Sequence, residues 1–252
     1  MRTPIKDLRH VSKALPTLKN LIPEESKVDS FLLFAGDLEI NLAEANRHVT
    51  SHTTEYVIYD FWHTLFEDAG RLVEHVKHFF PFPDEDVFLA CQDMFNNFKG
   101  SYSRSAMFFL LNRCSDTGTI SSGNFDQSNV NPLCVSYLTR FKKNNFDVKL
   151  NDNFIESLSQ ESDADFIFIP AGKFTYSFFQ EGMNTGEEKT VFEHEELRDA
   201  ALQLKKKTII MYSYHPKIIQ LYKKFKTKIL IDKYGKITQD KKKATEVLIA
   251  NF

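Results

Sequence analysis

The stretch Asp165-Phe166-Ile167-Phe168-Ile169 decides the fold, because aromatic and β-branched residues fill every position after the aspartate. A short run that is apolar on both faces is typical of a strand buried inside a parallel sheet. The runs 28–34 and 208–212 also predict short buried strands, and helical patterns cover 38–48 and 193–206. Strands that alternate with helices predict an α/β fold with a doubly wound sheet.

Both ends of the chain extend this pattern. Apolar positions at helical spacing predict a helix over 8–22, and the strand 28–34 ends at Ala35-Gly36. We predict a second strand over 55–60 that ends in Asp60. Near the other end, 228–231 and 246–249 predict two further strands, which we expect to be antiparallel.

The middle of the chain has a different pattern. Helical spacing dominates 61–80, 85–98 and 103–112, and a loop rich in Ser, Gly, Asn and Asp follows over 115–131. We therefore predict an α/β core made of 1–61 and 146–252, with a helical insert over 62–145.

Composition excludes several classes of protein. The chain has 252 residues, 42% of them hydrophobic, and a formal net charge of −2, which excludes a disordered chain and a wholly basic nucleic-acid coat protein. No apolar run approaches the ~20 residues of a membrane helix, and the first residues lack a secretory pattern. The three cysteines, Cys91, Cys114 and Cys134, fit neither a disulfide framework nor a zinc site. We expect a cytoplasmic protein with no membrane contact.

Two other patterns have both a functional and a structural interpretation. His75 and His78 lie one helical turn apart, but a third ligand is missing, so we predict no metal. Thirteen lysines and two acidic residues stand between Lys205 and Lys243, a local charge of +11. This run is either a set of solvated faces or a flank that meets phosphates.

Six sequence features occur along the chain in a fixed order that matters for its classification. They are the run 4–16, the tripeptide Phe34-Ala35-Gly36, Asp60, the segment Leu111-Asn112-Arg113 with Gly118, Asn124 and Phe125, the run 192–197, and the run 246–252. Together they resemble the Dam-type class of DNA adenine-N6 methyltransferases, which use S-adenosylmethionine. The resemblance covers nearly the whole chain. It implies a Rossmann-like methyltransferase fold, a mixed sheet with antiparallel C-terminal strands, and a helical target-recognition insert.

The family's catalytic motif, Asp-Pro-Pro-Tyr, is absent. The family places this motif directly after a buried strand, where this chain has Ile169-Pro170-Ala171-Gly172. The adenine amine is conjugated with its ring, so the Asp side chain and the adjacent Pro carbonyl must accept its hydrogens before the amine can attack. Neither Ile169 nor Pro170 carries a side-chain acceptor.

The cofactor motifs that the resemblance implies are also altered. Phe34, Ala35, Gly36 and Asp60 fall on the positions that hold the cofactor in the family. The twin glycines near the N-terminus are replaced within 9–11, and a second loop glycine is missing after Gly36, where Asp37 adds a negative charge. We therefore expect no cofactor, unless the pocket still accepts S-adenosylmethionine.

These losses predict a methyltransferase homologue without its reaction, a pseudoenzyme that binds DNA or a protein partner. Candidate DNA-binding residues lie in or beside the insert: Arg104, Asn112, Arg113, Asn124, Arg140, Lys142 and Lys143. Two alternatives stay open. One is an active adenine-N6 methyltransferase with a divergent active site, and the other is a structural or assembly protein that binds no nucleic acid.

Overall fold

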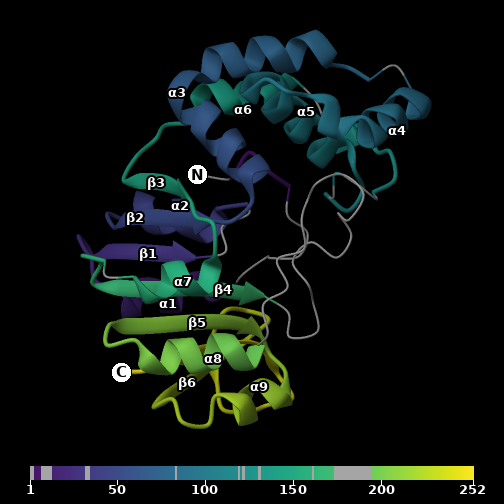
Figure 1. Ribbon diagram of the computed structural model, residues 1–252. Helices are drawn as coiled ribbons and strands as arrows, with labels where there is room; N and C mark the ends of the chain where they lie inside the picture. Colours follow the sequence, from purple (N-terminus) through teal and green to yellow (C-terminus); the bar gives the residue numbers. More distant parts are fainter. Residues whose placement is uncertain are drawn as a thin grey trace.

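The computed structural model describes residues 3–6, 13–31, 35–82, 84–118, 120, 123–129, 132–160, 162–172 and 194–252. Its centre is an eight-stranded mixed sheet with the order β3-β2-β1-β4-β5-β8-β6-β7 (Figure 1). The strands are β1 Lys27–Phe31, β2 His48–Thr53, β3 Phe146–Leu150, β4 Phe166–Gly172, β5 Lys207–Ser213, β6 Thr227–Asp232, β7 Ile237–Thr238 and β8 Ala244–Ala250.

The first five strands are parallel, and the last three add antiparallel pairs. Strand β1 pairs with β2 on one side and with β4 on the other. Strand β8 lies between β5 and β6 and is antiparallel to both. The predicted α/β class and the antiparallel C-terminal strands are therefore confirmed. The chain winds outward from β1 to β3 and then crosses to β4, so the β1–β4 boundary is the topological switch point of the sheet.

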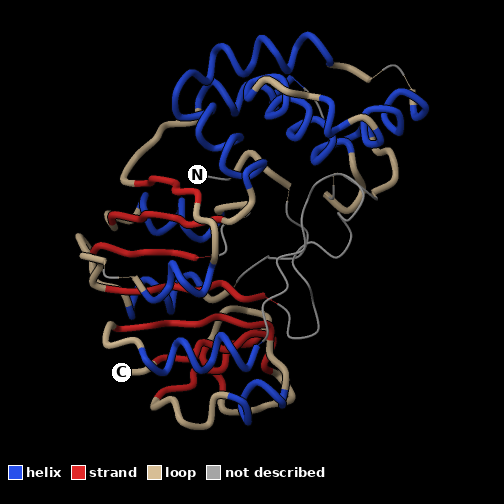
Figure 2. The backbone as a smooth tube through the Cα atoms, viewed as in Figure 1, coloured by secondary structure: helices blue, strands red, loops and turns tan. Residues whose placement is uncertain are grey.

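Helices cover both faces of the sheet (Figure 2). One face packs on α1 Leu15–Leu21 and α2 Asp37–Glu44, and the other packs on α7 Phe154–Ser159, α8 His194–Gln203 and α9 Pro216–Leu221. Alternate residues of β4 separate the two cores, because Phe166 and Phe168 join the first cluster and Ile167 and Ile169 join the second.

The remaining helices form a separate layer beyond β3. They are α3 Tyr56–Phe79, α4 Glu85–Asp93, α5 Ser101–Cys114 and α6 Pro132–Arg140, with the short 3-10 turns η1 Phe95–Asn97 and η2 Gln127–Asn129. Trp62 of α3 is fully buried and meets the ring of Phe146 on β3 edge to face at 5.4 Å. This contact joins the helical layer to the sheet in one hydrophobic core.

The predicted strand over 55–60 is wrong. The second strand is β2, 48–53, and helix α3 begins at Tyr56, so the helical layer starts before the predicted boundary at 62. Val57, Ile58, Phe61, Trp62 and Leu65 are all buried at helical spacing. Strand β2 was hidden because its sequence, HVTSHT, is polar.

Other boundaries differ by smaller amounts. The predicted first helix is observed over 15–21 and the first strand over 27–31, while 7–12 and 32–34 lie outside the described residues. Helices α6 and α7 and the short strand β7 were not predicted. Helix α3 also contains a kink at Asp68, whose carboxylate accepts the Arg71 amide at 2.9 Å and so caps the second half of the helix.

Candidate functional site

The carboxyl ends of the parallel strands form the candidate site. Sheets of this kind bind ligands outside that edge, at the switch point. Here the switch point lies between Phe31, which ends β1, and the last residues of β4.

The end of β4 is apolar and buried. Strand β4 pairs with β1 only as far as Phe168, but it follows β5 as far as Gly172, with a register shift between Pro170 and Gly172. All seven residues of β4 are buried. Ile169 and Ala171 pack in the cluster that contains Phe31 and Tyr212. The positions of the altered catalytic motif therefore present hydrocarbon and main chain at this edge, and no carboxylate or amide side chain.

The turn between β1 and α2 is the second part of the site. Ala35 and Gly36 are buried here, and Gly36 has a φ of 71°, which suits glycine. The Thr3 hydroxyl donates to the Ala35 carbonyl. Phe34, the third predicted residue of this loop, lies outside the described residues.

Two carboxylates already stand at the amino end of α2. Asp37 and Glu39 occupy its first turn, and the buried Glu39 Oε1 accepts the Ser30 hydroxyl at 2.9 Å. Acidic side chains at this end offset the positive end of the helix dipole. The turn is therefore a poor place for a further anionic group.

Asp60 is not at a strand end, so its predicted place is wrong. It lies in the first part of α3, where its Oδ2 accepts Arg104 Nε at 2.8 Å and also pairs with Arg104 Nη2. Both side chains are largely buried, with exposed fractions of 18% and 17%. The ion pair links α3 to α5. The acid that does follow β2 is Glu55, which is buried. The prediction overlooked it because Glu55 was assigned to the wrongly predicted strand over 55–60.

A histidine network lies on the face of the sheet that carries α7. His52 on β2 stacks on Phe31 with centroids 4.5 Å apart, and its Nδ1 contacts Asn151 Oδ1 at 2.9 Å. His52 Nε2 lies 3.6 Å from Asp29 Oδ1, and the Ser162 hydroxyl donates to the same carboxylate. Burial alone would raise the pKa of Asp29, but the contacts with His52 and Ser162 outweigh burial and lower that pKa.

A second group of hydrogen-bonded polar side chains lies near the end of strand β5. His194 Nδ1 contacts the Tyr212 hydroxyl at 3.0 Å, and that hydroxyl contacts the Tyr222 hydroxyl at 3.1 Å. Burial raises the pKa of both tyrosines, so they stay neutral and act as hydrogen-bonding groups. The sequence analysis did not predict this group of side chains, although His194 and Leu197 belong to the run 192–197, which contributes to the resemblance to the methyltransferase family.

Two of the predicted DNA-binding residues hold the protein together instead. Asn112 is fully buried, and its side chain accepts the Lys6 amide at 2.7 Å and donates to the Lys6 carbonyl at 2.9 Å and the Gly118 carbonyl at 2.6 Å. Arg104 is taken up by Asp60 and by the Phe98 carbonyl at 3.1 Å. Neither side chain is available to a nucleic acid in this structure.

The other five predicted residues are more accessible. Arg113 is half-buried and donates to Cys134 Sγ at 2.9 Å, and Asn124 is exposed and donates to Asp116 at 3.0 Å. Arg140 and Lys142 are exposed at the end of α6, and Lys143 pairs with Asp147. The last three lie at the end of α6 and in the segment that leads to the start of β3, which is on the amino edge of the sheet, opposite the candidate site. The structure does not bring the seven residues together.

Within the described residues, no three His, Cys, Asp or Glu side chains gather as metal ligands, and no helix could span a membrane. His75 stacks on Tyr102 at 5.8 Å and contacts the Ser103 hydroxyl at 3.3 Å, so its ring takes part in packing between α3 and α5.

Comparison with protein-family models and with curated proteins finds no match to this chain.

Proposed function

We propose that this chain is a catalytically inactive homologue of the Dam-type DNA adenine-N6 methyltransferases, which binds DNA through a methyltransferase-like scaffold. The observation that carries the proposal is the buried, apolar end of β4 at Ile169, Pro170 and Ala171. An adenine amine needs two hydrogen-bond acceptors beside the reacting methyl group, and the side chains at these positions offer none.

The topology supports the scaffold part of the proposal. The order β3-β2-β1-β4-β5 with an antiparallel strand inserted before β6 agrees with the mixed sheet that the family resemblance implies. The helical layer also lies between β2 and β3 in the sequence, where the resemblance predicts a target-recognition insert.

The residues present fit S-adenosylmethionine poorly. The cofactor carries a carboxylate, and Asp37 and Glu39 already place negative charge at the first turn of α2. Asp60, the predicted ribose acid, is held by Arg104 away from the strand ends. Glu55 is a feature that favours a cofactor, because it is a buried acid directly after β2. We therefore propose that no cofactor is used.

Titration calorimetry with S-adenosylmethionine tests the cofactor part. We expect no saturable heat at ligand concentrations near ~1 mM. A transfer assay with labelled S-adenosylmethionine and duplex DNA tests the catalytic part, and incorporation of label above that of a heat-denatured sample would establish the active-enzyme alternative.

The DNA-binding part is tested separately, on Lys142 and Lys143. We expect binding to duplex DNA that weakens as salt rises, and that weakens further when both lysines are changed to glutamate. Absence of binding at low salt would favour the structural or assembly role.

A further inference from the structure

The lysine-rich C-terminal region divides between the two edges of the sheet. Strands β5 and β6 are parallel to each other, because each is antiparallel to β8. The segments 205–207 and 223–228 lie where these strands begin, whereas 233–236 and 241–243 lie where β6 ends and β8 begins. The lysines between 205 and 243 therefore form two surfaces, one at each edge of the sheet.

The lysines of 205–207 and 223–228, which we call the amino-edge group, lie close together. Ile209 on β5 and Thr227 on β6 both pair with Ala250 of β8. Two strand spacings separate them, which is about 10 Å. The lysines just before each strand therefore gather over a short length, beside the end of β8.

This group has no acidic residue within its own stretch of sequence, although Asp163 and Asp165 lie just before β4, the neighbour of β5, where Asp163 pairs with Lys27. The sequence from 200 to 231 contains eight lysines and no acidic residue. Lys205, Lys223, Lys224 and Lys226 are exposed and form no ion pair within the part of the chain that the structure describes. Asp199 interacts electrostatically with Lys224, but its carboxylate is held by Arg198 at 2.8 Å.

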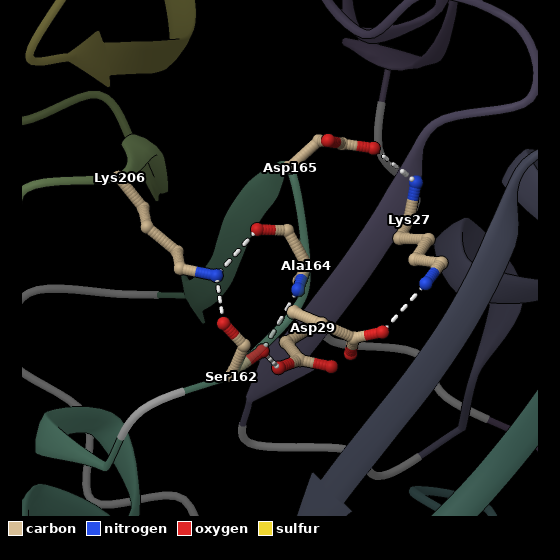
Figure 3. A network of polar contacts seen from close by, with 7 residues as sticks. Lys27, Asp29, Ser162, Ala164, Asp165 and Lys206 are labelled. Atoms are coloured by element: carbon tan, nitrogen blue, oxygen red, sulfur yellow. Dashed lines mark hydrogen bonds and ion pairs between the residues drawn. The ribbon is translucent and has the colours of Figure 1, made fainter.

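Two further lysines of the group serve the fold. Lys206 Nζ donates to the carbonyls of Ser162 and Ala164, and Ala164 O lies at 2.6 Å (Figure 3). Lys228 Nζ donates to the Phe225 carbonyl at 2.7 Å. These three bonds hold the segments that carry the exposed lysines, so the exposed charges are attached to fixed backbone.

The carboxyl-edge group is different, because its acids are interleaved. Asp232 and Asp240 stand among Lys233, Lys236 and Lys243, and Lys243 Nζ lies 3.9 Å from Asp240 Oδ2. It has a similar number of lysines but a partly balanced charge, which makes it a matched control for the amino-edge group.

We propose that the amino-edge lysines Lys205, Lys223, Lys224 and Lys226 bind the phosphate backbone of duplex DNA. The proposal rests on the DNA-binding part of the proposed function and places the contact on the edge of the sheet opposite the altered catalytic motif. Duplex DNA carries about six charges over 10 Å of its axis, so it matches the density of the group. Lysines are point charges that do not read bases, so binding does not depend on sequence. Arg140 and Lys142 precede β3, which begins on the same edge, four strand spacings (~19 Å) from β5 and six (~29 Å) from β6.

The experiment uses the full chain and a fluorescent duplex of roughly 20 base pairs, titrated from about 50 to about 200 mM salt. One variant carries Lys205→Glu, Lys223→Glu, Lys224→Glu and Lys226→Glu. The control variant carries Lys233→Glu, Lys236→Glu, Lys241→Glu and Lys242→Glu, which changes the net charge equally. We expect the amino-edge variant to bind at least ~10-fold more weakly and to lose about 0.9 in the salt slope for each phosphate contact removed. The control is expected to stay within about threefold of the wild type.

Each other outcome overturns the proposal. Equal losses in both variants would mean that net charge alone attracts DNA. An unchanged amino-edge variant beside a wild type that binds would remove this site and leave the proposed function in place, whereas a wild type that does not bind would remove both. Binding to phosphatidylserine vesicles but not to DNA, lost in the same variant, would reassign the surface to lipid. If the glutamate variant does not fold by circular dichroism, the four Lys→Gln changes replace it.

Discussion

Replacement of Asn112 by alanine is expected to destabilise the protein strongly without touching any DNA-binding surface. The side chain makes three hydrogen bonds, at 2.6, 2.7 and 2.9 Å, which tie the segment 3–6 to α5 and to the turn at Gly118. Each bond contributes about 1 kcal/mol net, and its loss leaves a main-chain group without its partner. The expected loss is therefore about 3 kcal/mol, or roughly 6–12 °C in Tm for a chain of this size.

The assay is urea unfolding followed by circular dichroism, with Asn124→Ala as the matched control. Asn124 also bonds to a side chain, Asp116, but it is exposed, so we expect a loss of about 0.5 kcal/mol or less. Asn112→Asp extends the test: it keeps an acceptor for the Lys6 amide but turns a carboxylate toward the carbonyls of Lys6 and Gly118, so it is expected to be at least as harmful as alanine. If Asn112→Ala costs no more than Asn124→Ala, the side chain is not a structural link and returns to the list of candidate DNA contacts.

Three further predictions concern other parts of the molecule. Because the pKa of Asp29 is lowered in the folded state, its carboxylate stabilises the fold above its ordinary pKa of 3.8 and loses this effect as the pH falls through the folded value. As the pH is lowered from about 6 to about 2, the urea midpoint should therefore fall less steeply in Asp29→Asn than in the wild type. The pair between Asp60 and Arg104 should show a coupling of about 1–3 kcal/mol in a double-mutant cycle with Asp60→Asn and Arg104→Gln, and additive losses would contradict the link between α3 and α5. Burial raises the pKa of the Cys114 thiol to about 12, so a disulfide reagent at neutral pH should label the half-buried Cys91 before it labels Cys114, and equal rates in the native protein would refute the packing described for α5.

The apolar strands could be predicted from the sequence because their signal is local. Strand β4 contains Phe166, Ile167, Phe168 and Ile169, and burial on both faces requires such residues. Strand β2 could not be found in this way. Its polar residues are stabilised by neighbours distant in the chain, as His52 is by Asp29 and Asn151. The hydrophobic pattern of α3, which starts three residues after β2, therefore predicts a strand where the structure has the beginning of a helix.

The candidate site could be predicted only in part for the same reason. The positions Ile169 and Pro170, where we propose an altered motif, could be located because they belong to a strand with a distinctive apolar sequence. The roles of Asn112 and Asp60 depend on partners 106 and 44 positions away in the chain, and no local pattern specifies those pairs. A polar residue that resembles a recognition motif has the same appearance in a sequence whether it faces a ligand or the protein's own backbone.

The position of β8 sets an order on the assembly of the sheet during synthesis. Strand β6 is joined to β5 only through β8, whose first residue is Ala244. Until the ribosome has released this strand, the β6–β7 hairpin has no place in the sheet, and the outer side of β5 is an unprotected edge. The nascent chain must therefore keep a β-strand edge exposed until residues 244–250 emerge, and a premature stop before 244 would leave that edge open to aggregation.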